Sequence, residues 1–236
     1  MKKFLFLSLI LLFSVFLYNS CEKAQNIKSP VTDQEFPGTA NKGESSKEVV
    51  LGTADLTIDA ARLQSSMVIR TKVFKAGDCA LVEACVNGSG KRKLLRFDVA
   101  TPNIGNADLI LGNPANNSLF VYSPCHGHYH FSDYANYDLL NANGSSVVAG
   151  HKQAFCLEDF SRYDPAAGPA KYTCSNQGIS VGWQDVYGSY LDCQWIDITD
   201  IQPGNYQLRV TINPLGKLTE STLTNNVATV PVKIPK

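Results

Sequence analysis

The segment Tyr206-Gln207-Leu208-Arg209-Val210-Thr211-Ile212 alternates apolar and polar side chains with a period of two. In extended backbone, successive side chains point to opposite faces, so leucine, valine and isoleucine share one face here. The dipeptide Pro203-Gly204 precedes the segment and is typical of a turn. The segment is therefore predicted to be a half-buried strand, with one face toward a core and the other toward solvent.

Similar short runs, rich in Val, Ile, Leu and aromatic residues, occur along most of the chain. Clusters of Gly, Asn, Asp and Pro separate them, as in residues 86–90, 112–117 and 141–144. This pattern predicts a mostly β fold: a single sandwich-like domain of antiparallel strands with long loops. Residues 60–66 and Ala166-Ala167 are compatible with short helical turns. The predicted strands are residues 49–58, 67–74, 94–99, 108–111, 120–122, 135–140, 195–198, 206–212 and 227–234.

The N-terminus predicts export. Met1-Lys2-Lys3 is a short positive region, and the fourteen residues Phe4–Leu17 after it are almost all apolar. This stretch has the length of a signal-peptide core and is shorter than the roughly 18 residues that a membrane-spanning helix needs. We therefore expect residues 1–20 to be a signal peptide. No later stretch is apolar enough to cross a bilayer.

The end of the signal, Ser20-Cys21, resembles a bacterial lipoprotein cleavage box. Cys21 would then be the lipid-modified first residue of a mature protein anchored to a membrane, in the periplasm or at the cell surface. The alternative is an ordinary signal peptidase site and free secretion. Residues 22–48 are rich in polar residues, Pro and Gly, and predict a flexible tether. Residues 49–236 are sufficient for one domain with a core of its own.

Charge and cysteine content narrow the range of functions. The chain has 21 basic and 21 acidic residues and no basic stripe with interleaved aromatics, which argues against a nucleic-acid partner. Apart from Cys21, an even number of cysteines remains in an exported chain, and this predicts three disulfides. No CxxC motif is present, and the sequence leaves the pairing open. The six are Cys79, Cys85, Cys125, Cys156, Cys174 and Cys193.

The motif Cys125-His126-Gly127-His128-Tyr129-His130 is the strongest chemical signal in the chain. It holds three of the four histidines at alternate positions. In one extended segment, the three imidazoles would share a face and converge, whereas a helix would spread them around its axis. Three histidines with open positions are typical of a catalytic Cu(II) or Zn(II) site. The sequence therefore predicts a metal site; the alternative is a polar strand with coincidental histidines.

This motif and several blocks after it resemble the lysyl oxidase family. The histidines are followed by Tyr137-Asp138-Leu139-Leu140-Asn141-Ala142-Asn143. The resemblance extends over about Ala54 to Val230, with further blocks at residues 203–206 and 220–227. The other matching blocks are Gly150-His151-Lys152-Gln153-Ala154-Phe155-Cys156-Leu157-Glu158-Asp159, Asp185-Val186-Tyr187-Gly188 and Asp192-Cys193-Gln194-Trp195-Ile196-Asp197-Ile198-Thr199-Asp200.

The resemblance implies a copper-dependent amine oxidase. His126, His128 and His130 would bind Cu(II), and Lys152 and Tyr187 would be joined as lysine tyrosylquinone after copper and O2 oxidise the tyrosine ring. The enzyme would convert a primary amine, either peptidyl lysine or a small amine, to an aldehyde, consuming O2 and releasing H2O2 and ammonia. No ordinary side chain is electrophilic enough to take two electrons from an amine, which is why such a cofactor is needed.

Other roles are implied less directly. Asp185 precedes Tyr187 by two residues and would share its strand face, so it is our candidate for the general base; the alternative is that it only fixes a turn or a hydrogen bond. His151 is interpreted as a local polar contact. The resemblance further implies the disulfides Cys79–Cys125, Cys85–Cys193 and Cys156–Cys174. The alternative functions are a copper- or zinc-binding surface β-sandwich without catalysis, and an adhesion-type sandwich with a structural metal.

Overall fold

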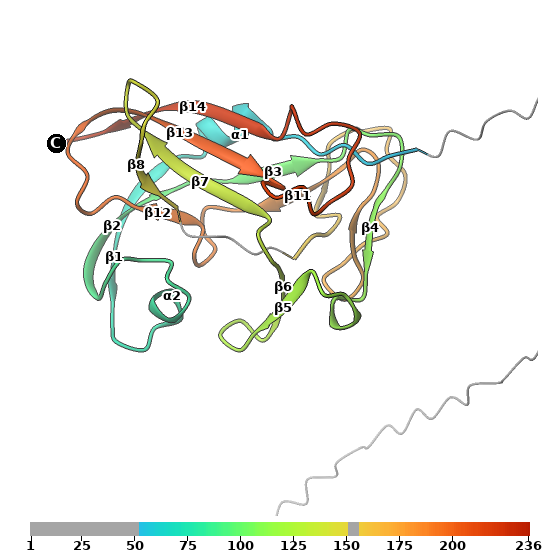
Figure 1. Cartoon of the computed structure of the whole chain (residues 1–236), viewed down its shortest axis with the longest axis horizontal. Helices are drawn as coiled ribbons and strands as arrows, with labels where there is room; N and C mark the ends of the chain where they lie inside the picture. The colour runs from blue at the N-terminus through green and yellow to red at the C-terminus, as the bar shows by residue number, and fades with distance from the viewer. Residues whose placement is uncertain (1–51, 151–155) are drawn as a thin grey trace, which may run out of the picture. The chain divides into compact units, whose positions relative to one another are not determined.

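The computed structural model describes residues 52–150 and 156–236. Strand β13 (Gly204–Ile212) pairs with β14 (Val227–Ile234) on one side and β7 (Ala135–Leu140) on the other. β8 (Ser146–Ala149) completes a four-stranded antiparallel sheet in the order β14-β13-β7-β8 (Figure 1). Leu208, Val210 and Ile212 are fully buried on one face of β13, so the alternating pattern predicted this strand and its inner face correctly.

The remaining strands form four smaller antiparallel sheets. The mostly β, antiparallel fold stapled by disulfides is therefore confirmed. The sheets consist of β1 (Val68–Phe74), β2 (Gly90–Arg96) and β12 (Trp195–Asp197); β3 (Val99–Pro102), β11 (Trp183–Tyr187) and β9 (Ser161–Arg162); β10 (Gln177–Ile179) and β4 (Leu109–Gly112); and β5 (Phe120–Ser123) and β6 (His128–Phe131).

Helices make up only a small part of this fold. α1 (Ala60–Ser65) forms where a helical turn was predicted, and the Asp59 side chain caps it by accepting a hydrogen bond from the Arg62 N–H. α2 (Cys79–Val82) and the 3-10 helix η1 (Pro114–Asn116) were not predicted. Ala166-Ala167 lies in a turn rather than a helix. Within the described part of the chain, no helix is long and apolar enough to span a membrane.

The main core lies between the sheets and draws side chains from nearly every element. Two of its largest members are tyrosines whose hydroxyls are satisfied internally. The Tyr134 hydroxyl donates to Thr101 Oγ1 at 2.7 Å, and the Tyr137 hydroxyl donates to Gln194 Oε1 at 3.1 Å. A buried hydroxyl without such a partner would be costly, so these bonds explain how two tyrosines can lie fully inside the core.

Two strand predictions need correction. The described part of residues 49–58 forms an isolated bridge, Leu56 to Asn103, and not a strand. The Thr57 and Asp59 N–H groups donate to carbonyls of β3, and the Leu56 N–H donates to Glu220 Oε2 at 2.7 Å. β2 begins at Gly90 rather than at residue 94, since the charged residues before residue 94 also pair with β1.

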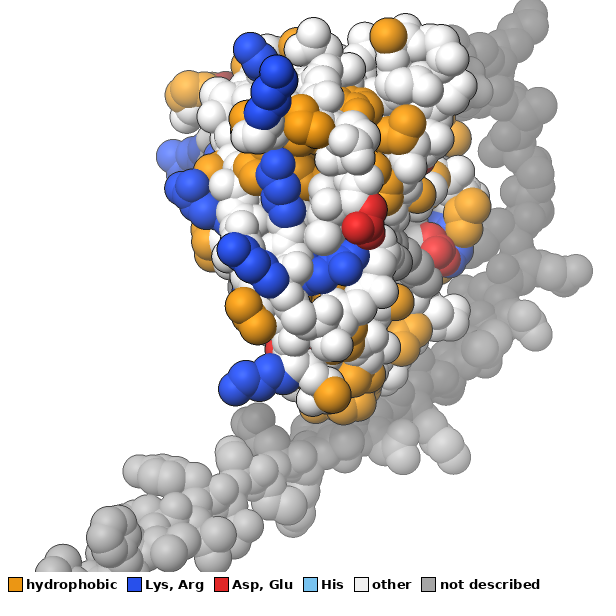
Figure 2. Space-filling model, turned by 90° about the vertical axis from the view of Figure 1, so that its left-hand side faces the viewer, with side chains coloured by type: hydrophobic (Ala, Val, Ile, Leu, Met, Phe, Trp, Pro, Cys, Tyr) orange, Lys and Arg blue, Asp and Glu red, His pale blue; other side chains and the backbone are white. Residues whose placement is uncertain are grey.

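β1 and β2 lie on the side of the molecule that Figure 2 faces, where lysine and arginine side chains gather.

Three disulfides join the pairs that the family resemblance implied: Cys79–Cys125, Cys85–Cys193 and Cys156–Cys174. Their Cα–Cα distances of 5.6, 5.2 and 5.4 Å lie in the usual range. Cys79 is the first residue of α2 and Cys85 follows its end, so α2 is tied at both ends. The Cys79 disulfide reaches Cys125, the residue before His126. The Cys85 disulfide reaches Cys193, in the loop after β11.

Candidate metal centre and active site

The histidine motif forms the hairpin between β5 and β6. His128 and His130 alternate on β6 as predicted, but His126 lies in the connecting turn and not on the same extended segment. Gly127 has a φ of +70°, a conformation that favours glycine, and its N–H donates to the Ser123 carbonyl at 2.9 Å. The prediction of one extended segment was therefore wrong at His126, because a glycine between two histidines allows a tight turn.

The three imidazole rings are nevertheless gathered together. Their ring centroids lie 5.9 Å apart for His126 and His128, 5.2 Å for His126 and His130, and 4.7 Å for His128 and His130. His128 Nε2 and His130 Nε2 are 2.9 Å from each other. Two ring nitrogens at this distance suit a shared proton or a shared metal ion, so the donor chemistry fits Cu(II) or Zn(II).

Glu83 is a member of this site that sequence reasoning missed. Its Oε2 lies 2.9 Å from His126 Nε2, and its Oε1 accepts a hydrogen bond from Ser123 Oγ at 2.6 Å. Burial opposes its ionisation, but the hydrogen bonds from Ser123 and His126 and the nearby imidazoles outweigh burial and lower the pKa of Glu83. Its place between Cys79 and Cys85 was the available signal, since Cys79 pairs with the cysteine beside His126.

His130 is the imidazole with the most perturbed protonation. Burial, followed by the like charges of His128 and His126, lowers its pKa from 6.5 to about 4, against a smaller opposing effect of Glu83. A neutral imidazole is the form that binds metal, so this shift favours metal binding near neutral pH.

We expect His130 of the metal-free protein to titrate near pH 4 rather than 6.5 in an NMR titration of its ring protons. The unfolded chain takes up this proton first, so this residue should make the free energy of unfolding fall as the pH drops from 6.5 toward 4. His130→Asn should remove that component of the pH dependence. A midpoint at or above 6.5 for His130 would contradict the buried environment described here.

A cleft of about 620 Å³ opens over the histidines. Glu83 and the three imidazoles line one part of it, and Tyr187 lines another part, together with residues 191–193. The exposed side chains of Val82, Val121 and Tyr122 form an apolar portion of the lining. The cleft therefore brings the predicted metal-binding residues and the predicted quinone tyrosine to one solvent-accessible space.

Tyr187 is the last residue of β11 and packs partly against the main core. Burial, followed by the nearby carboxyl of Asp185, raises its pKa, so its phenol holds a proton at neutral pH. Asp185 lies two positions earlier on the same strand and is only 3% exposed. Burial, followed by the negative charge of Glu158, raises the pKa of Asp185 well above its usual value. Asp185 does not line the cleft, and its Oδ1 accepts a hydrogen bond from the Val186 N–H at 2.8 Å.

Lys152 and His151 lie outside the described residues, and so do Cys21, the predicted signal peptide and the predicted tether. The residues on either side of that gap are described. The Gly150 N–H donates to the Tyr137 carbonyl, and the Cys156 backbone donates a hydrogen bond to Tyr187. The chain therefore resumes, four residues after Lys152, in contact with the predicted quinone tyrosine.

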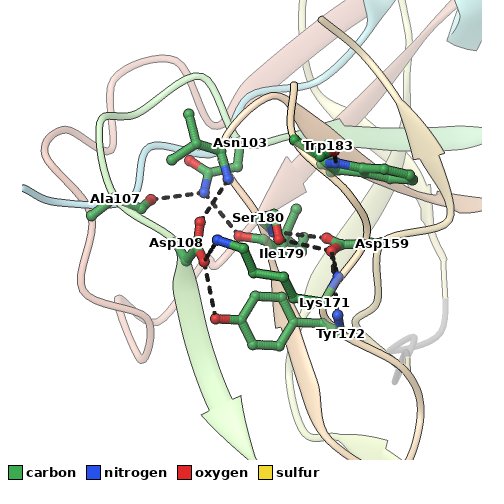
Figure 3. Close-up of polar contacts among 11 residues, drawn as sticks. Asn103, Ala107, Asp108, Asp159, Lys171, Tyr172, Ile179, Ser180 and Trp183 are labelled. Atoms are coloured by element: carbon green, nitrogen blue, oxygen red, sulfur yellow. Dashed lines mark hydrogen bonds and ion pairs between the residues drawn. The ribbon is translucent and has the colours of Figure 1, made fainter. Parts of the chain in front are cut away.

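A partly buried hydrogen-bond network fixes the segment between Cys156 and β11 (Figure 3). Both oxygens of Asp159 are used: Oδ1 accepts from the Ser180 N–H at 2.7 Å, and Oδ2 accepts from the Ser180 hydroxyl and from the Lys171 and Tyr172 N–H groups. Asp108 binds the side chains of Lys171 and Tyr172 at 2.8 and 3.2 Å. These contacts hold the loop that leads into β11 and thereby help to place Tyr187.

Among the described residues, two groups of potential metal ligands have donor atoms that all lie within 4.8 Å of one another, and the three histidines are not one of these groups. The two groups are Glu83 with Cys85 and Cys193, and Glu158 with Cys156 and Cys174. In both groups the two cysteines form a disulfide, and a disulfide sulfur is not the thiolate that binds metal. Neither group therefore supports a second metal site.

Comparison with known proteins places this chain in a family. The lysyl oxidase family model matches residues 54–235. Lysyl oxidase homolog 3B of Danio rerio is 44% identical over 186 residues, covering 73% of this chain and 22% of the zebrafish protein. Lysyl oxidase homolog 3 of Homo sapiens is 41% identical over 185 residues, covering 73% of this chain and 24% of the human protein. The chain thus matches about a quarter of the length of these relatives, and it belongs to the lysyl oxidase family.

Proposed function

We propose that this chain is an amine oxidase that uses copper and lysine tyrosylquinone to convert primary amines to aldehydes, with O2 consumed and H2O2 and ammonia released. The observation that carries this proposal is the shared cleft: the three imidazoles and the Tyr187 ring line the same space of about 620 Å³. Membership of the lysyl oxidase family supports the same chemistry.

His126, His128 and His130 would hold the copper ion, and Lys152 with Tyr187 would provide the quinone. Copper and the quinone together would supply the two-electron oxidation of the amine by O2. The chain's own residues orient the reactants: β11 fixes Tyr187 at the cleft, and the hairpin of β5 and β6 fixes the histidines. The apolar cleft lining would accept the carbon chain of an amine.

The two ends of the gap support Lys152 as the partner of Tyr187. Cys156 contacts Tyr187 and is held by its disulfide to Cys174. Lys152 precedes Cys156 by only four residues in the sequence, which supports the pairing of this lysine with Tyr187.

Asp185 is our candidate for the general base. Burial raises its pKa, which makes its carboxylate a stronger base once it is ionised. It lies on the same face of β11 as Tyr187, but it does not line the cleft. We therefore propose that it would take the α-proton of an amine held at Tyr187, from a position that bulk solvent reaches very little.

Export is the setting we propose for this chemistry. Three disulfides require an oxidising compartment, which agrees with a signal peptide at residues 1–20. A lipid at Cys21 would anchor the domain to a membrane through the tether at residues 22–48. The substrate would be a primary amine, either on a polypeptide or as a small molecule.

The proposal is tested by loading the full chain with copper in air and mapping its peptides by mass spectrometry. Lys152 should be found covalently joined to Tyr187, and phenylhydrazine should give a coloured adduct. Lys152→Arg should lose the cross-link, the colour and peroxide release from a primary amine, while it retains copper. Lys91→Arg, at an exposed position on β2, is the matched control and should behave as wild type. Peroxide release that persists in Lys152→Arg would refute the cofactor assignment.

A further inference from the structure

We infer that a second cavity, next to the candidate active site, is a subsite for a carboxylate carried by the amine substrate. The inference rests on the proposed function and deepens it by naming a substrate class. The substrates would be primary amines whose molecule also holds a carboxylate, either on an acidic peptide side chain or on a free amino acid. The cavity has a volume of about 410 Å³. Arg70, Lys72 and Arg96 line it, and none of the described residues in its lining is acidic.

The cavity adjoins the cleft over the histidines. Ser189 lines the cavity two residues after Tyr187, and the chain then returns to the cleft lining at Leu191. Two residues span at most about 7 Å, so this part of the cavity lining lies close to the predicted quinone tyrosine. An ion pair at 2.9 Å joins Lys72 of the cavity to Asp192 of the cleft lining. The two spaces are therefore close enough for one substrate molecule to contact both.

Arg96 is a partly buried cation whose hydrogen bonds go to neutral groups. Its Nη1 donates to the carbonyls of Ser189 and Leu191 at 2.7 and 3.3 Å. Its guanidinium carbon lies 4.4 Å from the centroid of the Trp195 ring. Burial lowers the pKa of Arg96, and the negative charge of Asp192 opposes this effect only in part. A buried cation whose charge is incompletely compensated is stabilised by an added anion.

Arg70 and Lys72 bring two more cations to the same face of the sheet. They alternate on β1, so their side chains point the same way, and both are exposed. Arg96 of β2 is the partner of Val68 on β1 and therefore shares this face. Asp192 bonds to Lys72, so one carboxylate serves three cations. A guanidinium offers paired N–H donors that match the two oxygens of a carboxylate, which makes this cavity suited to that group.

The test measures kcat/KM of the copper-loaded full chain, at low salt, on two pairs of amines that differ in negative charge. One pair is a lysine peptide flanked on both sides by glutamate or by glutamine. The other pair is free lysine and lysine amide. Arg70→Gln removes one cation from the cavity. Lys91→Gln is the matched control, because it removes the same charge from the opposite face of the same sheet.

Wild type should prefer the carboxylate-bearing member of at least one pair by about fivefold in kcat/KM, and high salt should reduce this preference. The pair that shows the preference identifies the source of the carboxylate. In Arg70→Gln the ratio of the two kcat/KM values should fall to near one, mainly through KM, whereas Lys91→Gln should keep the wild-type ratio. Because a ratio is compared, a general loss of activity does not imitate this result.

Three outcomes would overturn the inference while the proposed function stands. They are equal kcat/KM within both pairs in wild type, a ratio that Arg70→Gln leaves unchanged, and an equal fall in Lys91→Gln, which would assign the preference to overall charge. A copper-loaded wild-type chain that releases no peroxide from any of these amines, nor from a simple alkylamine, would instead overturn the proposed function and this inference with it.

Discussion

Replacing Tyr187 with phenylalanine is expected to abolish peroxide release from a primary amine while copper still binds. The phenol oxygen is the atom that the proposed quinone requires, and phenylalanine lacks it. Enzymes accelerate their reactions by at least about a millionfold, so loss of the cofactor should reduce turnover by about a thousandfold or more, to background.

Tyr187→Phe removes only the hydroxyl, because phenylalanine keeps the ring that packs against the core. It removes the hydroxyl that the Cys156 backbone contacts, which should cost about 1 kcal/mol of stability and leave the protein folded. The histidine hairpin lies on different strands, so copper stoichiometry should be unchanged. His128→Ala, in contrast, should lose both copper and turnover.

Tyr190→Phe is the matched control for Tyr187→Phe. Tyr190 lies three residues further along, is 72% exposed and does not line the cleft with the histidines. Peroxide release is followed with a coupled peroxidase assay, and copper is measured in the same samples. Turnover that survives in Tyr187→Phe at more than about a tenth of wild type would show that the redox group is elsewhere, since enzymatic acceleration is far larger than that.

The fold could be predicted where burial and local pattern agree. On β13, each apolar residue of the alternating segment faces the core, so the period of two was sufficient. On β2, Lys91, Arg92 and Lys93 carry no such signal, yet they pair with β1 because the hairpin continues beyond the core. Hydrophobic pattern identifies the part of a strand that is buried, and not the part that is only hydrogen-bonded.

The site could be predicted only in part, for a related reason. His126, His128 and His130 are adjacent in sequence, so their spacing alone indicated a metal site. Glu83 directly follows a short helix that no sequence pattern indicated, and the Cys79–Cys125 disulfide joins this helix to the residue before His126. Tyr187 and its place at the cleft were anticipated only through the resemblance, because nothing local distinguishes it from other tyrosines on strands.

Removing the Cys85–Cys193 disulfide is expected to cause a large loss of stability, of about 3–5 kcal/mol in the free energy of unfolding. Of the three bridges described, it closes the longest loop, with a sequence separation of 108 compared with 46 and 18 for the others. A longer loop loses more freedom in the unfolded chain when it is closed, so its bridge stabilises the fold more.

The paired substitution Cys85→Ala and Cys193→Ala is the appropriate variant, because both residues lie in a buried cluster with Trp195 and Phe74 where a serine hydroxyl would lack a partner. Cys156→Ala with Cys174→Ala is its control, since that bridge closes a loop of separation 18 and should cost about 3 kcal/mol or less. Urea unfolding without reductant measures both variants. If the control lost as much stability as the variant at Cys85 and Cys193, chain entropy would not be the main effect. The local strain and packing at each disulfide would then determine how much stability its removal costs. In that case, packing on Trp195 rather than the disulfide would hold α2 beside the histidines.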